Sequence, residues 1–218
     1  MATRGDPAAL EIEDLIRRGH ESPDVDAKAP GSWKVWSKAE KAELVRDMMA
    51  MANSDRPGWI LLGISEGSAG EWVYDGLTEA QSASFDPSRI GGKVKRFADP
   101  EVAFSVHREQ FDGRWYVAIR TEPFQKMPHI CKASHPGVLD EGVIYVRNEA
   151  CETTRVTAAE QMRRLIERAI QMHADSIVGR IAELMAQAGM LGAVAEAPKP
   201  EAEWARRIQE ARQEAGKP

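Results

Sequence analysis

The sequence predicts a mixed α/β protein, with one β-sheet domain flanked by helices over residues 7–157 and a helical extension after it. Short apolar runs bounded by turn residues alternate with segments of helical periodicity up to residue 157. One long amphipathic pattern then fills residues 158–190, and a Pro/Ala/Glu-rich tail over 191–218 is predicted to be flexible. The 43% hydrophobic and 29% charged content is ordinary for a globular protein.

Helix-start signals precede four of the segments with helical periodicity. Each signal is a Ser, Thr or Asp followed either by Pro at the first helical position or by Glu three residues later. The signals are Asp6-Pro7, Ser37 with Glu40, Asp86-Pro87, and Thr157 with Glu160. We therefore predict helices over residues 7–18, 38–53, 87–97 and 157–189.

Strands are predicted where apolar runs are too short for a stable helix. WILLGIS, residues 59–65, is a continuous apolar run typical of a buried strand. VAFSVHRE and WYVAIRTE are joined around Asp112-Gly113, a pair that favours positive φ, and they predict a β-hairpin. Further strands are predicted over residues 24–28, 71–76, 129–134 and 142–149.

The stretch ESPDVDAK, residues 21–28, groups acidic side chains before the second helix. Pro23 disfavours a helix here, so we expect an extended segment. In a strand, Asp24, Asp26 and Lys28 point to one face, while Val25 and Ala27 point to the other. Like charges on one face are unfavourable unless something positive lies opposite them. The local sequence leaves open whether these acids face water or a cation.

The distribution of charge is uneven along the chain. The net charge is −5, which argues against avid non-specific binding to nucleic acid. Residues 1–85 carry a balance of −6 and residues 86–133 a balance of +3. This pattern is compatible with a metal site beside a phosphate backbone, and equally with ordinary scatter of surface charge.

Several classes of protein lack support in the sequence. No apolar run approaches the roughly 20 residues of a membrane span, and the N-terminus lacks a signal-peptide pattern. The two cysteines provide no disulfide framework, which favours a cytoplasmic setting. An ATP site is not expected, because the segment around Gly91-Gly92-Lys93 fails the phosphate-loop pattern. A zinc site is not expected either, because His129, Cys131 and Cys151 lack paired-ligand spacing.

An ordered series of motifs resembles the Schlafen AlbA_2 family, in its bacterial-type members. An E-x-x-x-x-acid-x-K segment precedes a helix ending in A-N-S, and a glycine-bearing buried strand and a G-x-x-Y-x-R strand follow. The resemblance covers residues 20–160. The matching positions are Glu21, Asp26, Lys28, Ala52-Asn53-Ser54, Gly58 to Glu66, Pro128, Gly142, Tyr145, Arg147, Thr154 and Arg155.

The resemblance implies a nucleic-acid-directed protein and, for nuclease members, a divalent-metal-dependent endoribonuclease with three acidic residues. By position, these acids are Glu21, Asp26 and Glu66, which would hold Mg²⁺ or Mn²⁺. Two departures stand out, since the family often has Glu at position 26 and a Gly-Gly turn at 57–58. RNA or DNA contacts are predicted at Lys28, Lys93, Lys95, Arg96 and Arg147.

Besides RNA cleavage, two functions remain open from the sequence: non-catalytic binding of nucleic acid, and interaction with another protein. The chain is either a catalyst or a non-catalytic DNA/RNA-binding or regulatory module of the same fold, in which the three acids are solvated carboxylates. The long helix over 157–189 is apolar on more than one stripe, which predicts a homodimer or a contact with a partner protein. The acidic, basic and helical features thus point to different partners.

Overall fold

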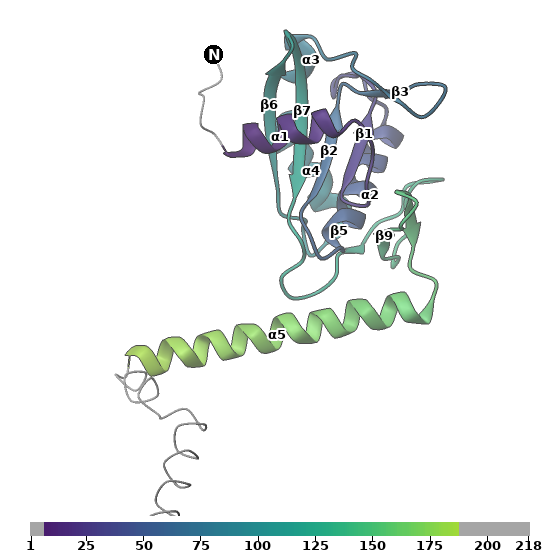
Figure 1. Cartoon of the computed structure of the whole chain (residues 1–218). Helices are drawn as coiled ribbons and strands as arrows, with labels where there is room; N and C mark the ends of the chain where they lie inside the picture. Colours follow the sequence, from purple (N-terminus) through teal and green to yellow (C-terminus); the bar gives the residue numbers. More distant parts are fainter. Residues whose placement is uncertain (1–6, 188–218) are drawn as a thin grey trace, which may run out of the picture. The chain divides into compact units, whose positions relative to one another are not determined.

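A computed structural model describes residues 7–187 (Figure 1). Its main sheet has four strands in the order β1-β2-β7-β6. These are β1 (Val25–Lys28), β2 (Gly58–Leu62), β7 (Arg114–Thr121) and β6 (Phe104–Phe111). The pair β1 and β2 is parallel, with Asp26 opposite Ile60, and the other two pairs are antiparallel. This mixed sheet with flanking helices confirms the predicted fold class.

Helices cover both faces of the sheet, so the central strands β2 and β7 contribute side chains to two cores. Helix α1 (Pro7–Arg18) crosses one face, and α2 (Lys38–Ala52) and α4 (Pro87–Phe97) cover the other (Figure 1). In β2, Trp59 and Leu61 pack in the core with α1, whereas Ile60 and Leu62 pack in the core with α2 and α4. The period of two along a strand therefore sends alternate residues to opposite cores.

The predicted starts of α2 and α4 and the predicted hairpin are confirmed. Ser37 and Glu40 form a capping box at the start of α2, and the Asp86 side chain caps α4. The hairpin between β6 and β7 turns at Asp112 and Gly113, with φ of 48° and 77°. Such left-handed conformations are tolerated by Asp and Gly better than by most residues, which explains the turn chemistry. Asp6 lies outside the described residues.

The shorter elements differ from the sequence prediction. Strand β4 (Trp72–Val73) pairs with β3 (Ser65–Glu66), β8 (Ile130–Cys131) with β5 (Ala98–Asp99), and β9 (Tyr145–Arg147) with β10 (Thr153–Arg155). The predicted strands over 71–76, 129–134 and 142–149 were therefore too long. Helix α3 (Glu79–Ser82), β5 and β10 were not predicted. These elements are too short for a periodic pattern, and the pairing of β5 with β8 joins segments far apart in the sequence.

Helix α5 (Ala159–Gln187) confirms the predicted long helix, but it begins two residues after Thr157. The predicted capping box is not formed, because the Glu160 side chain accepts hydrogen bonds from Arg163 and Arg164. The chain divides into two compact units, residues 1–170 and 171–218, so each is described by itself. In the first unit, Leu165 is buried and the Arg168 guanidinium lies 4.1 Å from the centre of the Phe124 ring. The predicted boundary near 157 and the predicted partner contact of this helix stay predictions. The predicted tail over 191–218 lies outside the described residues.

Among the described helices, none combines the length and apolar character needed to cross a membrane.

Candidate functional site

Asp26 lies on the face of β1 that is turned towards α2, because its neighbours Val25 and Ala27 belong to the core with α1. The residue is 7% exposed. Its Oδ1 accepts a hydrogen bond of 3.0 Å from Arg147 Nη1. Its Oδ2 lies 2.9 Å from Lys28 Nζ, in an ion pair whose geometry falls outside that of a hydrogen bond. Two cations therefore neutralise this carboxylate.

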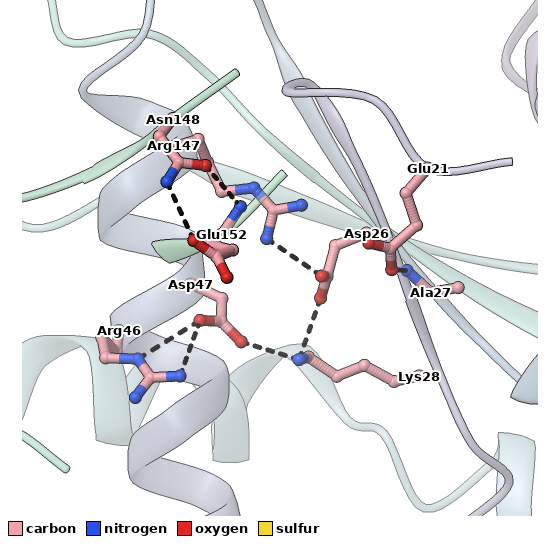
Figure 2. A network of polar contacts seen from close by, with 9 residues as sticks. All are labelled: Glu21, Asp26, Ala27, Lys28, Arg46, Asp47, Arg147, Asn148 and Glu152. Carbon is pink, nitrogen blue, oxygen red and sulfur yellow. Dashed lines mark hydrogen bonds and ion pairs between the residues drawn. The ribbon is translucent and has the colours of Figure 1, made fainter. Parts of the chain in front are cut away.

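Lys28 also pairs with Asp47 of α2. Its Nζ donates a hydrogen bond of 2.7 Å to Asp47 Oδ2, and Arg46 lies 3.3 Å from the other oxygen. The result is a row of alternating charges, Arg147–Asp26–Lys28–Asp47–Arg46, which we call the charge network (Figure 2). Burial alone lowers the pKa of Lys28, but the attraction of Asp47 and Asp26 outweighs it, so the net pKa is raised.

Arg147 is the most buried cation of the charge network, with a side-chain exposure of 3%. Its Nε and Nη2 are buried and have no hydrogen-bond partner within residues 7–187. The adjacent turn is held by Asn148, whose Nδ2 donates to Glu152 Oε2 and whose Oδ1 accepts from Glu152 N (Figure 2). Arg147 is thus fixed from β9 and directed at Asp26, away from solvent.

Glu21 and Glu66 are not members of the charge network. Glu21 Oε1 accepts a hydrogen bond of 2.9 Å from Ala27 N (Figure 2). Both glutamates line a hollow of about 460 Å³, and Cys151 lines it too. Burial raises the pKa of Glu21, the bond from Ala27 opposes this rise, and the carboxylates of Asp26 and Glu66 add to it. Asp26 does not line the hollow.

Asp26 is paired with cations and does not share the hollow of Glu21 and Glu66, and metal binding by these three residues stays a prediction. Mg²⁺ binds carboxylate oxygens at about 2.1 Å, so an ion on Asp26 Oδ2 would be forced against the ammonium of Lys28, already 2.9 Å away. No group of three or more His, Cys, Asp or Glu side chains in the described part of the chain could hold a metal ion. The structure brings together Glu21 and Glu66, and places Asp26 with cations.

Comparison with known proteins identifies the family. A model of the family described as "Schlafen, AlbA_2" matches residues 21–156, which include every member of the charge network and both glutamates of the hollow. The chain belongs to the Schlafen AlbA_2 family. No curated protein matches it.

Two solved structures resemble this Schlafen AlbA_2 protein at low identity. The DIP2311 protein from Corynebacterium diphtheriae is 15% identical, with a TM-score of 0.46 over 70% of this chain and 27% of that one. The chain thus spans about a quarter of the length of that protein. The N-terminal domain of a putative ATP-dependent DNA helicase RecG-related protein from Nitrosomonas europaea is 16% identical. Its TM-score is 0.39, over 69% of this chain and 97% of that domain.

The A-N-S motif of the Schlafen AlbA_2 domain has a structural role that sequence reasoning did not assign. Asn53 is 4% exposed and ends α2. Its Nδ2 donates hydrogen bonds to the carbonyl oxygens of His129 and Tyr145, and its Oδ1 accepts one from His129 N. Asn53 therefore ties α2 to β9 close to Arg147. The sequence signal was a polar residue at the end of an apolar helix.

The basic residues predicted to bind nucleic acid fall into two groups. Lys28 and Arg147 belong to the charge network, where Asp26 and Asp47 occupy them. Lys93, Lys95 and Arg96 lie on α4, where Lys95 and Arg96 are exposed and Lys93 is half-buried. Arg89, exposed in the first turn of α4, adds to this basic face and was not predicted. Within the charge network, Asp47 and Arg46 are the two residues that the sequence did not single out.

Proposed function

We propose that this protein is a nucleic-acid-binding Schlafen AlbA_2 module in which Asp26 is structural and not catalytic. The observation that carries the proposal is the double pairing of Asp26, at 3.0 Å from Arg147 and 2.9 Å from Lys28. A carboxylate neutralised by two cations in a buried setting has little tendency to bind another cation. The membership of the chain in the family supports nucleic acid as the ligand.

The basic face of α4 is the proposed contact with the phosphate backbone. Lys93, Lys95 and Arg96 are held by a helix whose Ile90, Val94 and Phe97 are buried in the core, so their positions are fixed. Positive side chains on a rigid helix contact phosphates without reading sequence. The region around α4, residues 86–133, also carries the local balance of +3.

The binding test changes Lys93, Lys95 and Arg96 to Gln together. The matched control changes three exposed arginines, Arg17, Arg18 and Arg108, to Gln. Affinity for duplex RNA and DNA is measured from 50 to 200 mM salt. If the α4 residues contact phosphates, the slope of log affinity against log salt falls by roughly 2–3 in the α4 variant. An equal loss of affinity in both variants would refute the assignment of the phosphate contact to α4.

A second candidate function is RNA cleavage at the hollow, and the observation favouring it is that Glu21 and Glu66 both line this space. Mg²⁺ or Mn²⁺ as cofactor belongs to this candidate. It requires Asp26 to leave Lys28 and Arg147, which the observed arrangement does not favour.

Cleavage is tested with structured RNA and Mn²⁺, using the unchanged protein, Glu66→Gln, and Glu79→Gln as an exposed acidic control. If the protein is the proposed binding module, the amount of cleaved RNA stays at the same background level with all three proteins. Cleavage that falls at least tenfold in Glu66→Gln alone would replace the proposal with the endoribonuclease. Cleavage that is equal in all three indicates contamination.

A further inference from the structure

The loop between β1 and α2 is fixed against the segment that precedes α4. Trp33 is buried, and its backbone N–H donates a hydrogen bond of 2.9 Å to Ser84 Oγ. The rings of Trp36 and Phe85 lie edge to face, with their centres 5.1 Å apart. Lys41 Nζ donates a hydrogen bond of 2.6 Å to the carbonyl oxygen of Trp36. The residues between the two tryptophans are therefore carried on a backbone that is held at both ends.

The tip of this loop exposes an apolar side chain between two lysines. Val35 is 80% exposed, more than any other large hydrophobic side chain in the described part of the chain. Lys34 and Lys38, on either side of it in the sequence, are exposed. Trp36 is half-buried, and its indole N–H forms no hydrogen bond within residues 7–187. A branched apolar side chain that a fixed backbone holds in water gains free energy by contact with an apolar surface, so the tip has the character of a contact site.

The loop meets the start of the helix that carries the basic face. Phe85, which Trp36 contacts, directly precedes Asp86, the N-cap residue of α4, and Arg89 is exposed in the first turn of this helix. The Asp86 carboxylate accepts hydrogen bonds from two backbone N–H groups of that turn. Because the loop and the helix both present cations, a polyanion matches them in charge. Membrane binding scales with the buried apolar area, and one apolar side chain offers little, so nucleic acid is favoured over a membrane.

We propose that the tip of this loop binds unpaired bases of a nucleic acid whose phosphates lie along the basic face of α4. Val35 packs against the face of a base, and Lys34 and Lys38 pair with the flanking phosphates. The N–H of Trp36 donates to an oxygen of the same nucleotide. In an intact duplex the base faces are covered by stacking, so a strand with unpaired bases offers Val35 the apolar surface that a duplex lacks. This inference rests on the proposed nucleic-acid binding and narrows its ligand to single-stranded segments.

The test measures the fluorescence anisotropy of a labelled RNA, as a single strand and as the blunt duplex of the same sequence, with DNA of that sequence in parallel. The full chain is expected to bind the single strands about fivefold more tightly than the duplexes, because one base gains an apolar contact. Val35→Ser is expected to remove this preference and to leave the affinity for the duplexes unchanged. The matched control is Val178→Ser at an exposed position of α5, which is expected to leave both affinities unchanged.

A double variant, Lys34→Gln with Lys38→Gln, tests the phosphate contacts of the loop. Its control is Lys126→Gln with Lys132→Gln, which removes the same charge from two other exposed positions. The slope of log affinity against log salt is expected to fall by roughly 1–2 in the loop variant and to stay unchanged in the control. An equal fall in both would overturn the phosphate contacts assigned to the loop.

Different results would contradict this inference and the proposed function. Equal affinities for single strands and duplexes in the unchanged protein, or equal losses in Val35→Ser and Val178→Ser, would overturn the inference and leave nucleic-acid binding at α4 standing. Absence of binding to every strand and duplex would overturn both. Binding to phosphatidylserine vesicles that depends on Val35, with no binding to the single strands, would assign the tip to a membrane surface instead.

Discussion

At the scale of the residue, the decisive feature is that buried acids and bases form ion pairs with each other within the protein. Asp26 and Asp47 are 7% and 3% exposed, and Lys28 lies between them. Taking such charges out of water is costly, so a buried network is weak evidence of net stabilisation. Removing one member is a different matter, because it leaves an opposite charge buried and uncompensated.

Lys28→Met is therefore expected to lower the free energy of unfolding by about 3 kcal/mol. Methionine keeps the apolar stem but leaves Asp26 and Asp47 with one arginine partner each. The measurement is urea denaturation at pH 7, with exposed Lys34→Met as the control, for which little change is expected. Equal effects of the two substitutions would mean that the charge network contributes nothing specific.

Glu21→Gln is expected to raise stability at pH 7 and to have less effect at pH 4. The folded-state pKa of Glu21 is raised, so its ionisation disfavours folding, and this penalty appears as pH rises above the unfolded value of 4.5. Gln keeps an acceptor for the Ala27 N–H and removes the charge. Chemical denaturation at both pH values measures the difference. An effect on stability that is the same at both pH values would contradict the cost assigned to burying this charge beside Asp26 and Glu66.

At the scale of the element, α2 organises the site by two contacts near its end. The side chain of Asn53 joins α2 to the segments carrying His129 and Tyr145, and Met51 packs closely over β2 at Gly58. These contacts are made by residues distant in sequence, and they place β9 so that Arg147 reaches Asp26. Disturbing either contact should affect the charge network without touching a charged residue.

Asn53→Ala is expected to lower the free energy of unfolding by about 3 kcal/mol, because it leaves the buried backbone groups of His129 and Tyr145 without partners. The control is Ser54→Ala, since the Ser54 hydroxyl donates only to the local carbonyl oxygens of Met51 and Arg56. Denaturation gives the stability, and amide hydrogen exchange of β9 reports whether this strand loosens first. Unchanged protection of Tyr145 to Arg147 would argue against the role given to Asn53.

Gly58→Ala is expected to destabilise the protein by roughly 1–3 kcal/mol, because its Cβ would lie 2.5 Å from Met51 Cβ, forcing strand and helix apart. The same substitution at Gly92 of α4 meets no atom within 4 Å. Gly92→Ala should instead stabilise by about 0.5–1 kcal/mol through helix propensity. The two variants therefore shift the thermal midpoint in opposite directions, and a shift in the same direction would contradict the packing argument.

At the scale of the whole molecule, the first turns of α5 share contacts with the sheet domain. Arg168 Nη1 donates to the carbonyl oxygen of Ser54 and lies 3.2 Å from Asp55 Oδ1, while its guanidinium stacks over Phe124. Further along α5, several apolar side chains are exposed, among them Ile177, Val178, Ile181 and Leu184. The helix thus begins as part of the first unit and continues into the second.

A chain ending at residue 170 should keep the thermal stability of the first unit, whereas one ending at 157 should lose several degrees. The shorter chain lacks buried Leu165 and the contacts of Arg168 with Ser54, Asp55 and Phe124. Calorimetry of both truncations measures the difference. Identical midpoints would support the boundary predicted near 157.

The sequence by itself determined the fold class, the long helices and the hairpin. The spacing of apolar residues, the capping residues and the turn residues each act over a few positions. They can therefore be recognised in short stretches of sequence. The acidic face of β1 was also predictable, because side chains alternate along a strand. The placement of Glu21 and Glu66 at one hollow agrees with the motif order, although metal binding there stays a prediction.

Only the tertiary structure decided what lies opposite those acids. Asp26 is paired with Arg147, 121 positions away, and Lys28 with Asp47, 19 positions away. No local pattern encodes such pairings, because they depend on how α2 and β9 pack beside β1. Desolvation then makes the pairing obligatory, since a buried carboxylate without a cation would be strongly disfavoured. The cations that pair with Asp26 of β1 are therefore side chains of the protein itself.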